Sequence, residues 1–422
     1  MKRGFYTIMA AQFFSSLADN ALLIAAIALL IELAAPEWMK PLLKLFFTVS
    51  YVVLAPFVGA FADSMPKGKV MFITNTIKVL GCALLFFAVH PLLAYAVVGF
   101  GAAAYSPAKY GILTELLPPE KLVAANGWIE GTTVGSIILG TVVGGALISP
   151  TVSGLLLGLD FPGVDFNIDS PAESAILVIG GFYIIAALFN LRIPDTGARY
   201  SKQHTNPIKL VQDFWYCNTT LWRDKLGQIS LAVTTLFWGA GATLQFIVLQ
   251  WAKEQLNMPL SKAAILQGIV ALGIAGGAVL AARFVALKQT PSVLKLGVFM
   301  GLVVPGMTLV TSMESSIPLL ILIGGLAGYF VVPMNALLQH RGHVLLSAGH
   351  SIAVQNFNEN LNILLMLGLY ALLIKFDFHV NSIIWIFGLF VAGTMLLVIR
   401  RYRYNKQHYD LDALIGVEKH SH

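Results

Sequence analysis

Charged residues are scarce in this sequence of 422 residues. They make up 11% of the chain, while hydrophobic residues make up 57% and the mean hydropathy is +0.77. Soluble domains carry about a quarter charged residues, so this balance excludes an ordinary soluble enzyme. It predicts a membrane protein, because lipid tails accommodate apolar side chains and spanning helices satisfy their own backbone hydrogen bonds.

Cysteine is almost absent as well. The two cysteines, Cys82 and Cys217, are too few for a disulfide framework or a structural zinc site. The sequence also lacks HExxH, GxSxG, Walker and GxGxxG motifs in a suitable context, so we expect no enzymatic activity, no metal and no cofactor. A cleavable signal peptide is not expected either, since the first apolar run is too long and has no small-residue cleavage site.

The chain is rich in apolar runs long enough to cross a bilayer, which takes about 20 residues. These runs predict an all-α membrane protein. The twelve expected transmembrane helices cover 5–34, 41–62, 70–89, 91–115, 126–148, 174–193, 226–252, 262–286, 291–311, 316–338, 350–374 and 380–400.

Lysine and arginine collect in alternate loops, and the positive-inside rule places those loops in the cytoplasm. The basic positions on that side are Lys2, Arg3, Lys67, Lys69, those of the segment 194–225, Arg283, Lys288, Lys295, Arg341, Arg400, Arg401 and Arg403. The opposite side carries an acidic loop with Asp160, Asp165, Asp169 and Glu173. We therefore expect both termini in the cytoplasm, and the net charge of +6 requires no nucleic-acid partner.

The expected helices fall into two halves that share a short repeat. GAAAY at 101–105 resembles GLAGY at 325–329, an offset of 224 residues, and Glu115 falls on Gln339 at the same offset. With six helices on each side of a basic segment, this layout resembles the two halves of a major facilitator transporter. The expected domains are an N-terminal six-helix bundle (1–193), a cytoplasmic basic linker (194–225), a C-terminal six-helix bundle (226–404) and a cytoplasmic tail (405–422).

A polar stripe runs along the first expected helix. Gln12, Ser15, Ser16 and Asp19 recur at helical spacing, and Asn20 follows directly. In the functional interpretation, Asp19 binds a cationic group or a coupling ion. In the structural interpretation, it pairs with a neighbouring helix. We favour the first, because a charge inside a spanning helix is costly and intramembrane carboxylates usually face a pathway.

The fourth expected helix contains the string YSPAKYG, in which Pro107 marks a kink. Tyr105 and Lys109 are one turn apart and share a face. The compact ammonium of Lys109 suits a phosphate or carboxylate, and we favour this binding role. The alternative is that Lys109 extends to the cytoplasmic interface or pairs with Glu115.

The eleventh expected helix contains QNFNENLN at 355–362. Gln355 and Glu359 are four residues apart, as are Asn356 and Asn360, so one flank is densely polar. Such a flank must face an aqueous cavity or other helices rather than lipid. It suits hydrogen bonds to hydroxyls or an ammonium, and the alternative is an amide clamp between helices.

Two further charges fall inside expected helices, Lys78 in the third and Glu130 in the fifth. For both, a functional role and a structural pairing remain open. The fifth helix also carries glycines whose spacing of four is typical of close helix packing. These glycines are Gly131, Gly135, Gly140 and Gly144.

Six strings across both halves resemble bacterial lysophospholipid transporters, major facilitator proteins of the Gram-negative inner membrane. They are AQFFSSLADNALL (11–23), YVVLAPFVGAFADSMPKGKV (51–70), GFGAAAYSPAKYGIL (99–113), TLFWGAG (235–241), YFVVPMNALLQ (329–339) and SIAVQNFNEN (351–360). The resemblance implies the major facilitator fold and inward flipping of lysophosphatidylethanolamine and related lysophospholipids by alternating access. It also implies a cytoplasmic acyltransferase/acyl-carrier-protein synthetase that re-acylates them. We expect the transporter itself to be a monomer.

The family's binding residues carry over onto matching positions of this sequence. The resemblance implies substrate-binding roles for Asp19, Lys109, Gln355, Asn356, Glu359 and Asn360, to which we add Asn20, Tyr105, Lys78 and Gln245. Gln245 departs from the family, whose members have an arginine there, so any phosphate contact of that arginine is lost or moves to Lys109 or Lys78. His350 replaces an expected asparagine.

Four residues are expected to act in gating. The facilitator loop after the second helix is stretched here and contains Asp63, Lys67 and Lys69. We expect it to keep its gating role with altered geometry. Glu130 is the fourth residue assigned to gating or conformational change.

Two other function classes compete with lysolipid transport. A proton-coupled major facilitator exporter or permease for drugs or small polar solutes would use Asp19 as a proton site, but the six strings favour the lipid transporter. A membrane-embedded lipid-modifying enzyme would need a nucleophile–base or histidine–acid pair near the interface, and none stands out. A zwitterionic lysolipid matches the residues well: its phosphate suits Lys109, its ammonium suits Asp19 or Glu359, and its hydroxyl suits the amides at 355–360.

Overall fold

The computed structural model describes residues 3–116, 119–158, 170–197, 206–346 and 348–415, and these contain helices and no strand. Ten helices in this part of the chain are long and apolar enough to cross a membrane. They are α1 (Arg3–Glu32), α4 (Lys67–Phe86), α5 (Pro91–Leu116), α8 (Pro171–Leu191), α10 (Gly227–Gln255), α11 (Leu260–Phe284), the run η1 (Leu287–Val293), α12 (Leu294–Val303) and η2 (Val304–Leu309), α13 (Met313–Leu345), α14 (Ala348–Lys375) and α15 (Val380–His408).

Two further expected spans are present as broken helices, and proline explains both breaks. The span at 41–62 consists of α2 (Met39–Val53) and α3 (Ala55–Asp63), with Pro56 in the first turn of α3. The span at 126–148 is α6 (Pro119–Leu147), which bends by 66° into α7 (Pro150–Leu157). Proline lacks the backbone donor of a helix interior and disfavours helical geometry in the residue before it. The major facilitator-like all-helical architecture of the described residues is consistent with twelve spans.

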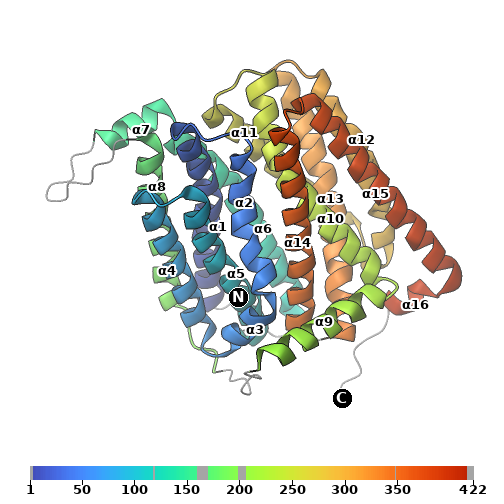
Figure 1. Ribbon diagram of the computed structural model, residues 1–422. Coiled ribbons are helices and arrows are strands. Elements are labelled where there is room, and N and C mark those ends of the chain that lie inside the picture. Colours follow the sequence, from blue (N-terminus) through green and yellow to red (C-terminus); the bar gives the residue numbers. More distant parts are fainter. Residues whose placement is uncertain (1–2, 117–118, 159–169, 198–205, 347, 416–422) are drawn as a thin grey trace. The chain divides into compact units, whose positions relative to one another are not determined.

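The chain divides into two compact units. The first contains residues 1–54, 58–203 and 257–268. In it, α4 packs against α5 and α8, and α1 packs against α6 and α8 (Figure 1). Gly140 and Gly144 of α6 allow this approach, because an added Cβ would lie 2.4 Å from the Leu17 carbonyl and 2.8 Å from the Ala21 carbonyl. An added Cβ at Gly131 or Gly135 would meet nothing within 4 Å, so the packing expected there is not found.

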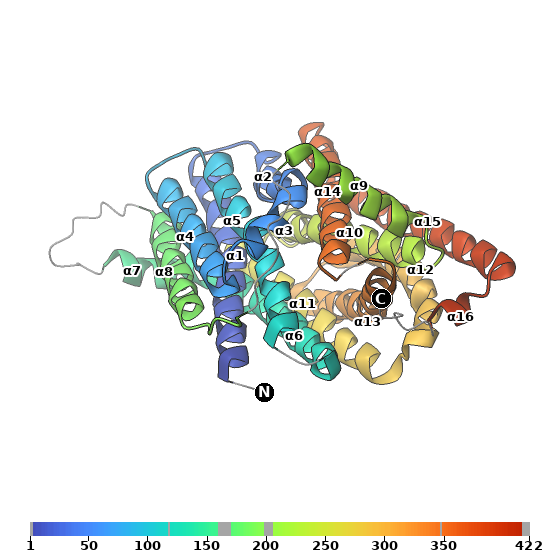
Figure 2. The ribbon, with the colours of Figure 1, turned by 90° about the horizontal axis from the view of Figure 1, so that it is seen from below.

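The second unit contains residues 55–57, 204–256 and 269–422. In it, α10 packs against α13, α14 and α15, and α12 lies beside α15, as Figure 2 shows from below. The buried Trp251 of α10 donates its indole hydrogen to the Met307 carbonyl at 3.1 Å. This bond satisfies a carbonyl in η2, where the helix tightens next to Pro305.

The central polar segment, expected as a linker, contains the amphipathic helix α9 (Pro207–Arg223). Its inner stripe, Phe214 and Leu221 among others, is buried against α10, α13 and α14. A second stripe is apolar yet exposed and consists of Ile208, Val211, Trp215 and Trp222. A third stripe is polar and carries Lys209, Asp213 and Arg223. This three-sided pattern is typical of a helix that lies in a membrane interface.

Candidate functional site

A buried ion pair lies at the centre of the first unit. The Lys78 ammonium of α4 lies 2.9 Å from each carboxylate oxygen of Asp19 on α1. The Lys78 side chain is 1% exposed and that of Asp19 is 21% exposed. The structure therefore brings together two of the residues singled out in the sequence, and Asp19 is the more exposed partner of the pair.

Polar side chains from three helices complete this cluster around the pair. Tyr183 of α8 donates its hydroxyl to Asp19 Oδ1 at 2.6 Å. The Lys78 ammonium also donates to Ser15 Oγ at 3.0 Å, and Ser15 donates in turn to Asn75 Oδ1 at 2.7 Å. Hydrogen bonds to both partners are what make a buried ion pair tolerable, since desolvation otherwise exceeds the Coulombic gain.

Aromatic rings surround the Lys78 ammonium. Its Nζ lies 5.2 Å from the centre of the Tyr105 ring and 5.5 Å from that of Tyr183, within the range of cation–π attraction. The Tyr105 hydroxyl is buried and makes no hydrogen bond in the described structure. Such an orphaned group needs an explanation, and a polar substrate group is one candidate partner.

A glycine on α5 provides the room for Lys78. An added Cβ at Gly101 would lie 2.7 Å from the Thr74 carbonyl and 2.8 Å from Lys78 Cγ, so α5 approaches α4 as closely as it does because position 101 has no side chain. The GAAAY string therefore has a local function, which is to let Tyr105 and Lys78 meet.

Two other residues expected at this site lie at its margin. Lys109 is partly exposed, and its ammonium lies 4.3 Å from the centre of the Tyr110 ring. Asn20 donates its amide to the Ser16 carbonyl of its own helix at 2.8 Å. Lys109 thus lies one turn beyond Tyr105 on α5, outside the contacts of the Asp19–Lys78 pair described above.

The polar flank of α14 forms a second cluster, which belongs to the second unit. Gln355 donates to Glu359 Oε1 at 2.7 Å and to Asn335 Oδ1 of α13 at 3.1 Å. Gln355 and Glu359 are 9% and 6% exposed. A carboxylate so deeply buried is costly, which makes Glu359 a candidate for a cationic or hydroxyl-bearing substrate group.

The asparagines of this flank divide between structural and accessible positions. Asn358 accepts from Trp222 of α9 at 3.0 Å and donates to Asn218 of α9 at 2.7 Å. Asn362 donates to the Thr235 carbonyl of α10 at 2.8 Å. These two form the amide clamp that was one of the alternatives.

Asn356 and Asn360 are half-buried and four residues apart, and the Asn360 amide donates to the Asn356 carbonyl at 2.7 Å. Gln245 is half-buried on α10. The structure therefore places all three on helices of the second unit, where their substrate-binding roles remain predictions.

The structure describes the side chains of two of the four residues expected to act in gating, Lys67 and Lys69. Lys67 begins α4, is buried, and donates to the Ala62 carbonyl at 2.8 Å, which closes the turn between α3 and α4. Lys69 lies in the same first turn of α4 and is exposed. The side chains of Asp63 and Glu130 fall outside the described part of the structure, as do Asp160, Asp165 and Asp169 of the acidic loop.

Tyr183, Asn75 and Asn335 belong to these clusters but were not predicted from the sequence. Asn75 and Lys78 are three residues apart and share a face of α4, so their spacing carried a signal. Tyr183 had none, because a single tyrosine in an apolar helix is ordinary. Asn335 lies three residues before the expected end of its helix in the string VVPMNALLQ, which marked it by resemblance rather than by pattern.

The sequence matches the family model described as Major Facilitator Superfamily over residues 8–361. The chain is 42% identical over 376 residues to a protein named lysophospholipid transporter LplT from Yersinia enterocolitica, covering 89% of this chain and 88% of that protein. It is 41% identical over the same length to a protein of that name from Yersinia pestis, with the same shares covered.

Solved structures agree on the fold. A POT family transporter in complex with 5-aminolevulinic acid superposes with a TM-score of 0.71 at 14% identity, covering 96% of this chain and 97% of that one. A bacterial homologue of the human lysosomal transporter Spinster, inward-facing and occupied, gives a TM-score of 0.66 at 13% identity, covering 97% of each chain. The chain belongs to the major facilitator superfamily and, within it, to the family of the lysophospholipid transporter LplT.

Proposed function

We propose that this protein transports lysophospholipids such as lysophosphatidylethanolamine across the membrane, from the outer to the inner leaflet, by alternating access. The observation that carries the proposal is the identity of 41–42% over 89% of the chain with proteins named lysophospholipid transporter LplT. Membership of the major facilitator superfamily makes the protein a transporter. We propose that it catalyses no chemical step.

The paired charges of the first unit support a zwitterionic substrate. Separating Asp19 from Lys78 would leave two buried charges unpaired, which is strongly unfavourable. A headgroup that carries both a phosphate and an ammonium can replace each partner as the pair separates. A substrate of one charge sign can replace only one of the two partners, so the pair favours a headgroup that carries both charges.

Each unit by itself offers further polar groups to a lysolipid. In the first unit, Lys109 offers a cation to a phosphate from one turn beyond Tyr105. In the second unit, Glu359 offers an acceptor and Gln355 a donor to an ammonium or a glycerol hydroxyl. The acyl chain needs only apolar side chains around it, and these helices carry many of them.

We further propose that the protein resides in a bacterial inner membrane with both termini in the cytoplasm. Delivery to that side would present the lysolipid to a cytoplasmic acyltransferase/acyl-carrier-protein synthetase, the partner implied by the sequence resemblance. The basic residues at the ends of α11, α12 and α15 support this orientation. We propose a monomer as the transporting unit.

Uptake into spheroplasts tests the proposed activity. Spheroplasts of a strain without its own lysophospholipid transporter would express this chain and receive labelled lysophosphatidylethanolamine, a labelled sugar or a cationic drug. We expect uptake of the lysolipid and no transport of the other two. Transport of the drug or the sugar, with no lysolipid uptake, would support the proton-coupled exporter or permease instead.

Cysteine labelling tests the orientation within one helix. Asp377, three residues before α15, and Lys406, near the end of α15, are both exposed, and the 29 residues of this helix are long enough to cross a bilayer. In a background with Cys82→Ala and Cys217→Ser, we expect Lys406→Cys to react with an impermeant maleimide after permeabilisation and Asp377→Cys to react in intact spheroplasts. The reverse pattern would place the termini outside.

Replacing Lys109 tests the phosphate contact. A charge-assisted contact contributes on the order of 1.5–3 kcal/mol, or roughly ten- to hundredfold in affinity. We expect Lys109→Ala to weaken binding of lysophosphatidylethanolamine and lysophosphatidylglycerol alike by about this factor, measured on monodisperse protein. Lys253→Ala, which removes an exposed lysine of α10, serves as the control. Wild-type affinity in folded Lys109→Ala protein would mean that Lys109 serves the membrane interface.

A further inference from the structure

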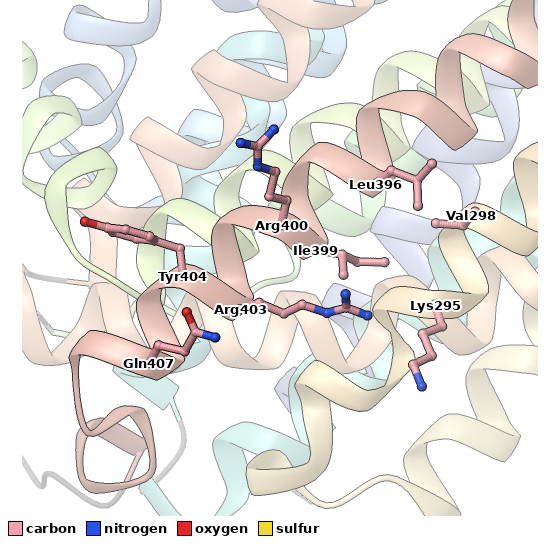
Figure 3. Close-up of a pocket in the computed structure, with 8 residues that line it drawn as sticks. All are labelled: Lys295, Val298, Leu396, Ile399, Arg400, Arg403, Tyr404 and Gln407. Atoms are coloured by element: carbon pink, nitrogen blue, oxygen red, sulfur yellow. The ribbon is translucent and has the colours of Figure 1, made fainter.

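A groove lies between α12 and α15 in the second unit, away from the clusters described above. Its volume is about 670 Å³. Its walls contain Lys295 and Val298 of α12 and Leu396, Ile399, Arg400 and Arg403 of α15. Figure 3 shows Arg403 extending from α15 towards α12, where Lys295 lies, while Leu396 and Val298 lie together at the other end.

Helical spacing explains why these residues line one groove. Leu396, Ile399, Arg400 and Arg403 are separated by steps of three and four, so they form a single stripe on α15. Lys295 and Val298 are three apart and form the matching stripe on α12. The packing of α12 against α15 brings the two stripes together.

The groove is polar at one end and apolar at the other. Lys295 lies in the first turn of α12, and Arg403 lies in the part of α15 that continues past residue 400. Val298 lies one turn after Lys295 on α12, and Leu396 lies two turns before Arg403 on α15. The outer surface beside them, with Phe299, Leu302 and Leu397, is exposed and apolar, as expected where lipid covers a protein.

Three cations line the groove. Lys295, Arg400 and Arg403 are exposed, and in the part of the chain that the structure describes none of them pairs with a carboxylate. Like charges in one groove repel each other unless an anion joins them. Two guanidinium groups and an ammonium provide the donors that bind phosphate oxygens.

We propose that this groove binds an anionic phospholipid of the surrounding leaflet, of the phosphatidylglycerol or cardiolipin type, which is the cytoplasmic leaflet in the orientation proposed above. Its phosphate contacts Lys295, Arg400 and Arg403, and an acyl chain lies along Val298, Leu396 and Ile399. Basic pockets between helices on this side of a membrane are suited to such headgroups.

The apolar half of the groove favours a lipid over an acidic soluble protein as the occupant of the groove. Because it continues into the exposed apolar surface of α12 and α15, its occupant must reach into the hydrocarbon layer. A phospholipid does so and a soluble acidic protein does not. The site goes beyond the proposed transport activity, since it lies outside the Asp19 and Glu359 clusters and holds a lipid rather than moving one.

Native mass spectrometry of the full-length protein tests this site. Protein reconstituted in nanodiscs of dioleoylphosphatidylethanolamine with dioleoylphosphatidylglycerol is released, and the lipid that remains bound is identified. We compare wild type with the triple variant Lys295→Gln/Arg400→Gln/Arg403→Gln. The matched control is Lys209→Gln/Arg283→Gln/Lys288→Gln, which removes three exposed cations of the second unit outside the groove.

Wild type and the control are expected to retain phosphatidylglycerol in preference to phosphatidylethanolamine. The groove variant is expected to lose this preference, with retention of phosphatidylglycerol lowered roughly ten- to hundredfold. Arg400→Lys/Arg403→Lys, which keeps the charge of the groove, is expected to retain most of the preference for phosphatidylglycerol. Equal retention in the groove variant and the control would overturn the proposal. Because the experiment measures bound lipid rather than transport, failure of the proposed lipid site is distinguishable from failure of the proposed function.

Discussion

Replacing Lys78 with methionine is expected to destabilise the folded protein by about 3–5 kcal/mol, because it leaves the Asp19 carboxylate largely buried without a cation. Asp19→Asn is expected to destabilise as well, since Lys78 is 1% exposed and would then lack its anion. The double variant Asp19→Asn/Lys78→Met removes both charges and is expected to recover most of the lost stability. Thermal unfolding of the detergent-solubilised protein measures all three.

A transport assay distinguishes the structural role of the Asp19–Lys78 pair from its proposed role in substrate binding. The double variant is expected to fold and to remain inactive, because its site holds neither charge that a zwitterionic headgroup requires. Lys40→Met is the matched control: it breaks a pair with the more exposed Glu37, for which the expected cost is below about 1 kcal/mol. A double variant that transports lysophosphatidylethanolamine normally would make the pair purely structural.

The second large effect is expected at a buried ion pair between Asp224, which precedes α10, and Arg341, which lies near the end of α13. Arg341 donates from Nε and Nη2 to the two carboxylate oxygens of Asp224 at 3.0 and 2.7 Å, and from Nη1 to the Leu414 carbonyl at 2.8 Å. It thereby joins the start of α10, the end of α13 and the C-terminal helix α16 (Leu411–Ile415). Arg341→Met is expected to cost about 3–5 kcal/mol and to release residues 409–415 to proteolysis.

The Asp224–Arg341 pair also predicts how the stability of the protein depends on pH. Burial opposes the charge of Asp224, but hydrogen bonds from Arg341 and the Gly227 amide outweigh it and hold the pKa of this carboxyl below its usual range. A depressed pKa contributes stability above the unfolded value of about 3.9, and this stability is lost as the pH falls through the folded pKa. Asp224→Asn is therefore expected to flatten the fall in Tm below about pH 4. A fall as steep as in wild type would remove Asp224 from the explanation.

The spans could be predicted from the sequence because hydropathy and length determine them directly. The two breaks at Pro56 and Pro150 were not predicted, and hydropathy gives no measure of a bend. The helix α9 was missed because its segment was classified by its charge. The spacing of Phe214, Asn218 and Leu221, which are buried together, would have identified it.

The candidate site could be predicted as a set of residues but not as an arrangement. Asp19 and Lys78 were each recognised as costly charges, yet they are 59 residues apart and no helical periodicity relates two different helices. The flank of α14 shows the same limit. Spacing grouped Gln355 with Glu359 correctly, whereas the partners Asn335 and Asn218 lie on other helices.

Reconstitution of the purified protein measures lysophospholipid transport most directly. Labelled lysophosphatidylethanolamine is added to the outside of proteoliposomes of defined lipid composition, and the fraction that albumin can no longer extract is followed with time. We expect this protected fraction to grow with wild-type protein and to stay at the level of empty liposomes with Asp19→Asn/Lys78→Met. Equal rates in wild-type proteoliposomes and in empty liposomes would contradict lysophospholipid transport by this protein.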